Sequence, residues 1–211
     1  MYFNQQSRST LQKKTVPRST SCGFTMVELL IAVAIFFVLI SLAIPSFRSL
    51  TAKNRLKTAC NELVSTLQTA RTEAIRRGIR VTVCKGAPSS NSCDNNGAWV
   101  SGWIVFVDAT PGSSPGIEDA SDIILRGGGN YSSDLVIVGN GGSNGPATYV
   151  SYTPDGFPKQ LGGGFYAGTL RVCSKSNALS NNERAFDLVI NAVGRVNITA
   201  ATGVSSSCPA P

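Results

Sequence analysis

The sequence contains no histidine among its 211 residues. A Ser-His-Asp triad, a Cys-His dyad and any metal site with an imidazole ligand are therefore excluded. None of the six cysteines stands in a Cys-x-x-Cys pair, which argues against a zinc site and against a thioredoxin-like redox motif. Their positions in a loop-rich region instead favour structural disulfides formed in an oxidising compartment.

Motifs for phosphate and calcium binding are missing too. No glycine run matches G-x-x-x-x-G-K-[ST] or leads into a helical pattern, so we interpret all three runs as turns. These runs are 127–129, 139–142 and 162–164. One loop region is acidic but lacks EF-hand spacing, so we interpret it as solvated. Its acids are Asp108, Glu118, Asp119 and Asp122. We find no catalytic constellation, and we predict that the protein is not an enzyme and uses no metal and no cofactor.

Charged residues make up only 15% of the chain, yet the formal net charge is +7. A basic balance suggests an acidic partner such as nucleic acid, lipid headgroups or another polyanion. The first 23 residues contribute about half of it, since they hold four cations and no acid: Arg8, Lys13, Lys14 and Arg18. Without them 15 cations face 12 acids, a net charge of +3.

The chain has one long apolar run, from Phe24 to Ile44, with Glu28 as its only charged residue. About 20 apolar residues suffice to cross a bilayer as a helix. A secretory signal peptide would have a shorter apolar core followed by a small-residue cleavage site, and no A-x-A follows here. A plain anchor does not account for a carboxylate, which is disfavoured inside a membrane.

The sequence after the apolar run keeps a helical period. Pro45 is expected to end or kink a helix, but the pattern resumes at once and continues to Gly78, a natural stop. The apolar stripe consists of Ala52, Leu56, Ala59, Leu63, Leu67, Ala70 and Ala74. We predict one long helix from Phe24 to about Arg77, half in a membrane and half packed on a globular body. Cys60 lies on this helix, where a small buried hydrophobe needs no further role.

From residue 79 the period changes to two and turn residues multiply, which predicts a β-rich body. The candidate strands are 79–84, 98–108, 122–126, 134–138, 148–153, 169–173, 184–190 and 194–199. Both faces of 98–108 are largely apolar, which is typical of a central strand covered on both sides. We expect the long helix to provide one of these covers.

Residues 23–28 read Gly-Phe-Thr-Met-Val-Glu and stand at the start of the apolar run. This arrangement resembles the processing site of type IV pilins and pseudopilins. The resemblance implies that a prepilin peptidase cleaves between Gly23 and Phe24, and that Phe24 is then N-methylated. It also implies that the carboxylate of Glu28 pairs with the N-terminal amine of a neighbouring subunit. Such charges attract strongly in a low-dielectric filament core only when both are present and close.

The same resemblance settles the expected topology. The positive-inside rule places the basic leader in the cytoplasm, but four cations just beyond the run weaken that argument: Arg48, Lys53, Arg55 and Lys57. A processed pilin precursor crosses the inner membrane once, with a cytoplasmic N-terminus and a periplasmic globular domain, and is then assembled into the pilus. We adopt this topology as the expectation for this chain.

Later stretches resemble the GspH/FimT branch of this superfamily. They are the helix end 67–78, the strand 102–108, an acidic Gly-Pro loop before 122–126, the segment 152–158, and 194–196. The resemblance implies an α+β fold, in which a long N-terminal helix with a transmembrane and an amphipathic half packs on a two-sheet antiparallel β body. The expected parts are a cleaved leader (1–23), a membrane or filament-core helix (24–44), its amphipathic continuation (45–78) and a globular pilin domain (79–211).

Members of this branch are minor pilins and minor pseudopilins. We therefore expect a minor pilin that contributes to the initiating tip complex of a type IV pilus and to pilus assembly. Its expected partners are other major and minor pilins, the prepilin peptidase and the inner membrane. A GspH-type minor pseudopilin of type II secretion is one alternative.

Another alternative is a pilin that binds double-stranded DNA during uptake, because FimT-type pilins of some competent bacteria carry a C-terminal Gly-Arg-x-Arg motif. The match here is incomplete, since Asn197 replaces the second arginine after Gly194 and Arg195. Other cations that would add to such a site are Lys159, Arg171, Lys175 and Arg184. With a mature charge of only +3, we favour a hairpin turn followed by a solvated Arg195.

Four cysteines of the body are expected to form two disulfides. We expect Cys84 to pair with Cys93, and Cys173 to pair with Cys208. The first pair would close a short loop, and the second would tie the C-terminal tail to a strand. Connectivity does not follow from sequence alone. Cys60 would then be free, and Cys22 would be lost with the leader.

Overall fold

The computed structural model describes residues 23–211 apart from 91, 95, 109–121, 142–144, 161 and 165. The leader cations, Cys22, Glu118 and Asp119 lie outside the described residues. The elements are α1 (Met26–Arg77), β1 (Val81–Lys85), η1 (Trp99–Ser101), β2 (Trp103–Val107), β3 (Ile123–Gly128), β4 (Leu135–Gly139), β5 (Tyr149–Tyr152), β6 (Gly168–Ser174), β7 (Ala185–Ile190) and β8 (Val196–Ala201). The predicted α+β fold is confirmed.

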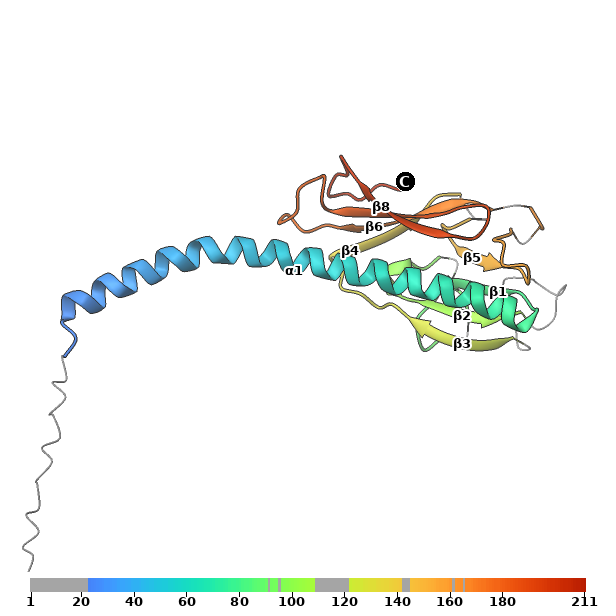
Figure 1. Ribbon diagram of the computed structural model, residues 1–211, viewed down its shortest axis with the longest axis horizontal. Helices are drawn as coiled ribbons and strands as arrows, with labels where there is room; N and C mark the ends of the chain where they lie inside the picture. The colour runs from blue at the N-terminus through green and yellow to red at the C-terminus, as the bar shows by residue number, and fades with distance from the viewer. Residues whose placement is uncertain are drawn as a thin grey trace, which may run out of the picture. The chain divides into compact units, whose positions relative to one another are not determined.

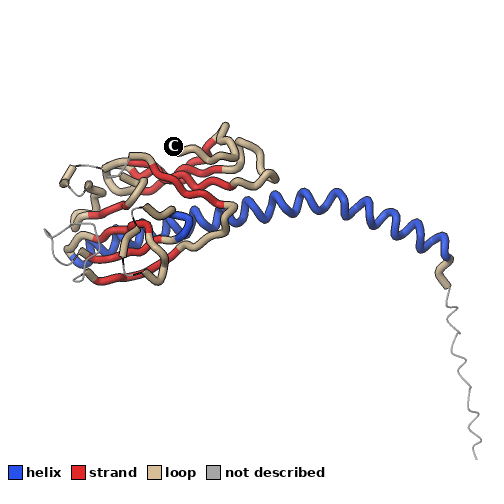
Figure 2. Tube along the Cα trace, turned by 180° about the vertical axis from the view of Figure 1, so that it is seen from behind, coloured by secondary structure: helices blue, strands red, loops and turns tan. Residues whose placement is uncertain are grey.

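The long helix α1 has 52 residues, with Pro45 inside it. It ends where Gly78 takes a φ of +65°, a conformation that favours glycine, and the Gly78 N–H donates to the carbonyl of Ala74 at 3.0 Å. The chain divides into two compact units after Leu42. The part of α1 beyond that point lies along both sheets (Figures 1 and 2), and its apolar stripe is buried there.

The first sheet has the strand order β3-β2-β1-β5, and all its neighbours are antiparallel. Every residue of β2 is buried, so β2 is the covered central strand that the sequence predicted. One face of β2 contributes Trp103 to the main core, where its indole N–H donates to the Thr66 hydroxyl of α1 at 3.3 Å. Its other face contributes Ile104 and Phe106 to a separate cluster with Cys84. The helix therefore covers only one side.

The second sheet has the order β4-β6-β7-β8, also antiparallel throughout. Its inner residues meet the helix and the first sheet in one core. Leu170 and Leu188 are cross-strand partners there, and both are fully buried. Burial of such apolar area is the main stabilising term of the body. The two-sheet antiparallel architecture expected from the resemblance is thus confirmed.

Two local expectations were wrong. The candidate strand 98–108 is interrupted, since Trp99–Ser101 form a 3-10 turn and the strand begins only after Gly102, which has a φ of +133°. Two of the glycine runs are not simply turns, because Gly127 and Gly128 belong to β3 and Gly139 is the last residue of β4. Their lack of side chains is needed there. A Cβ at Gly127 would lie 2.2 Å from the Pro88 carbonyl oxygen, and one at Gly128 would lie 2.8 Å from the Trp103 indole nitrogen.

Candidate functional site

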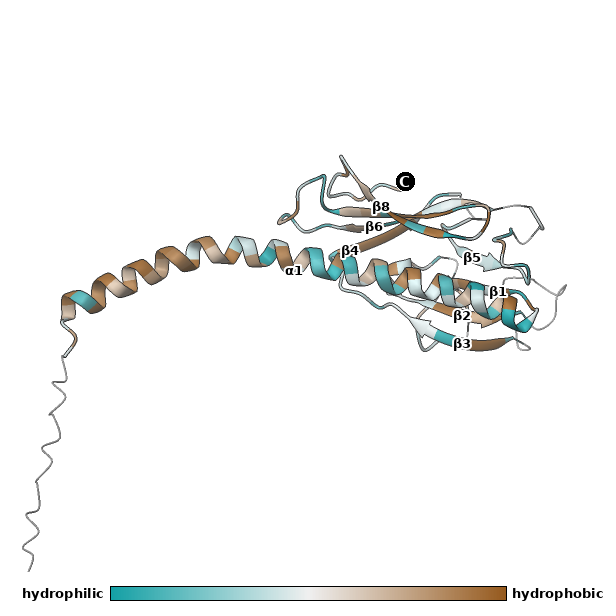
Figure 3. Cartoon of the chain, viewed as in Figure 1, coloured by the Kyte–Doolittle hydropathy of each residue, from teal (hydrophilic) through white to brown (hydrophobic). Residues whose placement is uncertain are grey.

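The first candidate site is the apolar start of α1. Among the described residues, α1 is the one helix that is apolar and long enough to cross a membrane, with a mean hydropathy of 2.9 over its most apolar window. None of that window is buried, and Figure 3 shows this half of α1 as mostly hydrophobic. Such an exposed apolar surface requires a lipid or protein environment.

Thr25 and Glu28 define how this helix begins. The backbone N–H of Glu28 donates to the Thr25 hydroxyl at 3.2 Å, so Thr25 acts as the N-cap residue. The sequence Thr-Met-Val-Glu has the spacing of a capping box, in which a Glu three residues after the cap suits the helix N-terminus. This role of Thr25 was not predicted from the sequence, although the T-x-x-E pattern signals it. Glu28 therefore lies in the first turn, close to the predicted new N-terminus.

Three stretches that carried the family resemblance meet at one point of the body. From the helix end, the Arg71 Nε donates to the Gly156 carbonyl at 3.0 Å. Gly156 belongs to the segment 152–158, and Gly194, which precedes β8, packs against it. Both glycines have a positive φ, +76° and +80°. A Cβ at Gly194 would lie 2.4 Å from the Gly156 oxygen. Through these contacts, the turn at Gly156 and the turn at Gly194 pack together at the end of α1.

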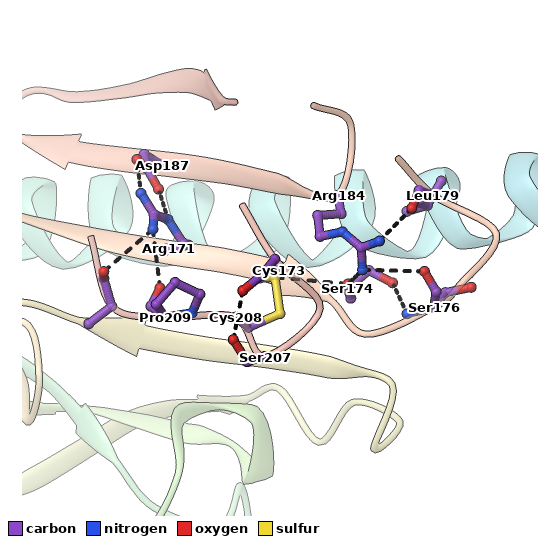
Figure 4. The surroundings of a disulfide bond; sticks show 12 residues. Arg171, Cys173, Ser174, Ser176, Leu179, Arg184, Asp187, Ser207, Cys208 and Pro209 are labelled. Atoms are coloured by element: carbon purple, nitrogen blue, oxygen red, sulfur yellow. Dashed lines mark hydrogen bonds and ion pairs between the residues drawn. A yellow bond between two sulfur atoms is a disulfide. The ribbon is translucent and has the colours of Figure 1, made fainter. Parts of the chain in front are cut away.

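Both expected disulfides are present, and Cys60 is free and buried. Burial raises the pKa of the Cys60 thiol to about 12. The Cys173–Cys208 bond joins the C-terminal tail to β6, and Figure 4 shows the tail beside Arg171. Arg171 donates to the carbonyls of Pro209 and Ala210, at 3.1 and 3.4 Å.

The cations suggested for DNA do not all point to solvent. Arg171 forms a two-bond ion pair with Asp187, at 2.7 and 2.8 Å. This hydrogen bonding raises the pKa of Arg171, so the guanidinium stays charged and bound to Asp187. Arg184 is only 5% exposed and donates to backbone carbonyls at one end of the second sheet (Figure 4). Both residues were predicted as additional cations of a DNA site, whereas both are engaged in hydrogen bonds within the protein.

The other three cations remain at the surface. Arg195 is exposed beyond the β7–β8 turn, and its backbone N–H donates to the Asn191 side chain at 2.8 Å, as expected for a hairpin. Lys175 is exposed, and Lys159 lies 3.7 Å from Asp155. In the described part of the chain, no group of three or more Cys, Asp or Glu side chains could hold a metal ion.

Comparisons with protein families identify two matches. The family model for the type II transport protein GspH matches residues 59–194. The prokaryotic N-terminal methylation motif matches residues 18–44. Two fimbrial proteins of Pseudomonas aeruginosa are each 39% identical over 72 residues, which is 34% of this chain and 46% of theirs. The chain thus spans about half the length of these relatives.

Two solved structures are similar at low identity. The type IV minor pilin FimU of P. aeruginosa is 18% identical, with a TM-score of 0.45 over 72% of this chain and 94% of that one. The minor pseudopilin EpsH from the type 2 secretion system of Vibrio cholerae is 13% identical, with a TM-score of 0.43 over 69% and 97%.

Proposed function

Because this chain belongs to the GspH family of pilin-like proteins, we propose that it is a minor pilin that enters a type IV pilus and helps to initiate its assembly. The observation that carries the proposal is the start of α1. There a methylation motif, a capped helix with an early carboxylate and an apolar surface without internal cover coincide. A helix of this kind is stable when it is inserted in lipid or packed among similar helices.

Processing would prepare this helix for assembly. Cleavage after Gly23 by a prepilin peptidase would make Phe24 the N-terminal residue, and N-methylation would follow. The new cation would stand in an apolar environment, where a carboxylate from a neighbouring subunit stabilises it. Glu28 supplies that carboxylate in our proposal. Before assembly the globular part lies in the periplasm and the apolar helix in the inner membrane.

The fimbrial relatives favour a pilus over a secretion system as the destination. The description of the family model favours the second candidate, a minor pseudopilin of type II secretion. Both candidates use the same helix in the same way, so they differ only in the subunits that surround it. DNA uptake has less support, because two of its candidate cations already bind groups of the protein itself: Arg171 binds Asp187, and Arg184 donates to the Leu179 carbonyl.

A deletion strain tests the proposal directly. We expect loss of surface pili and of twitching motility, both restored by the wild-type gene but not by Gly23→Val, which blocks processing. Normal piliation together with a defect in protein secretion would support the pseudopilin instead. Normal piliation, motility and secretion would contradict both.

A further inference from the structure

We propose that a groove at the membrane-proximal end of the body binds the headgroup of an anionic phospholipid while the protein resides in the membrane. The groove has a volume of about 740 Å³ and lies between α1 and the segment after β6. The helix contributes Ile44, Arg48 and Arg55 to its lining, and the opposite wall contributes Asp134 and Ser176. The inference rests on the proposed membrane anchoring, because a lipid site has meaning only there.

The helix presents its lining residues as a stripe. Ile44, Arg48, Thr51 and Arg55 follow each other at intervals of four, three and four residues, so they share one face of α1. Ile44 is the last residue of the apolar run, and Phe47 beside it is 70% exposed. The groove is therefore apolar at its membrane end and cationic beyond it, which is the polarity of a phospholipid.

The depth of Arg48 suits a headgroup. At a helical rise of about 1.5 Å per residue, Arg48 lies about 6 Å beyond Ile44 along the axis. A headgroup layer extends about 5–8 Å from the hydrocarbon core on each side. Arg55 lies about 16 Å beyond Ile44 on the same scale, outside this layer, where it attracts anionic lipid without contacting the phosphate.

The charge balance leaves Arg48 available. Arg55 pairs with Asp134 at 3.5 Å, and both side chains are more than half exposed. Such exposed pairs are weak, so Asp134 does little to neutralise the groove. Among the described residues Arg48 has neither an ion-pair nor a hydrogen-bond partner for its side chain. A cation of this kind at headgroup depth favours an anionic lipid by about fivefold over a neutral one.

The opposite wall is preorganised. The buried Arg184 donates to the carbonyls of Ser174 at 3.2 Å and Leu179 at 2.6 Å, and Figure 4 shows this clamp next to Ser176. Glu183, in the same connection, pairs with Lys53 of α1 at 2.5 Å. A wall held in this way keeps its conformation without a ligand, so binding loses little conformational freedom.

The test uses the full chain in lipid nanodiscs that contain equal amounts of phosphatidylglycerol and phosphatidylcholine. Native mass spectrometry then counts the lipids that remain on the protein. We expect about a fivefold preference for phosphatidylglycerol, which Arg48→Gln abolishes and Arg55→Gln reduces. Circular dichroism of each variant checks that the fold is retained.

A matched control separates the groove from general charge attraction. The double variant Arg48→Gln with Ser46→Arg keeps the net charge but moves the cation to the opposite face of the helix, within one turn. Ser46 is exposed and does not line the groove. We expect the preference to stay lost, and its return would overturn the proposal. A wild-type preference that inorganic phosphate removes would indicate a free-anion site and would also overturn it.

Two further outcomes are informative. If the chain forms dimers in the discs whatever the lipid, and shows no lipid preference, a second copy occupies the groove and the proposal is wrong. If the chain does not enter nanodiscs at all, the membrane anchoring fails together with the lipid site. Entry without lipid preference overturns only the lipid site.

Discussion

The carbonyl oxygen of Gly156 occupies the space where residue 194 would carry a Cβ atom, since an atom built there lies only 2.4 Å away. The same oxygen accepts a hydrogen bond from Arg71 at 3.0 Å. Two turns far apart in the sequence thus meet at the carbonyl to which the end of α1 donates. Gly194 is therefore a packing residue, whatever Arg195 beside it contacts.

We expect Gly194→Ala to destabilise the body strongly. A left-handed backbone costs a non-glycine residue about 1–2 kcal/mol, and the displaced Gly156 carbonyl adds to this loss. Gly203→Ala is the matched control, because Gly203 also has a positive φ of +71° but has nothing within 4 Å of its Cβ position. Urea unfolding measures both variants. Equal losses of unfolding free energy would show that the close approach of residue 194 to the Gly156 carbonyl does not affect stability.

The two disulfides should stabilise the protein unequally. The Cys173–Cys208 bond spans 35 residues and the Cys84–Cys93 bond only 9. Because a longer closed loop removes more entropy from the unfolded chain, we expect losses of about 4 and about 2.5 kcal/mol for the respective double alanine variants. Thermal unfolding of each variant checks the order. A larger loss for the shorter loop would contradict the loop-entropy account.

Cys60 should be inert in the folded protein. It is 2% exposed, and burial raises the pKa of its thiol to about 12, so almost no thiolate exists at neutral pH. In a Cys22→Ser background we expect no maleimide labelling under native conditions, and one label per chain after unfolding without reductant. Rapid labelling of the native protein would show that this region of α1 opens readily.

Glu73 should make the end of α1 sensitive to acid. Hydrogen bonds from Arg76 and Arg77 lower the pKa of Glu73 from 4.5 to about 2. A carboxylate with a lowered folded-state pKa stabilises the fold above its unfolded value, and this stabilisation disappears as the pH falls from 4.5 towards 2. We expect Glu73→Gln to reduce the difference in melting temperature between pH 6 and pH 3. High salt should reduce it as well, since the cluster is exposed.

Glu28 is expected to act in assembly and not in processing. Glu28→Gln keeps the size of the side chain and the Thr25 cap, whose hydrogen bond comes from the Glu28 backbone. We therefore expect normal leader cleavage, seen as a normal mature mass, but no incorporation into sheared pili. Thr25→Ala is the companion variant, which weakens the cap by about 1 kcal/mol and leaves the charge in place. Incorporation of the glutamine variant would refute the proposed pairing with a neighbouring amine.

Local patterns determined much of the fold. The helical period predicted α1 to its end at Arg77. Among the described residues, the period of two located seven strands to within two residues, and it placed the start of β2 five residues too early. These patterns succeed because side-chain periodicity reports which face of an element is buried. Prediction failed at Gly102, where a positive φ separates the 3-10 turn from β2. Nothing in the alternation of apolar residues there distinguishes a turn from a strand.

The sequence by itself determined the processing motif, the apolar run, the helix and the positions of the strands along the chain. Each of these depends on residues that are neighbours in the sequence. Only the tertiary structure decided that Arg184 is buried under its own loop, that Arg171 binds Asp187, and that the Arg48 groove exists. These features depend on strand register and on how the helix packs on the second sheet. Such contacts join residues distant in sequence, so no local pattern specifies them.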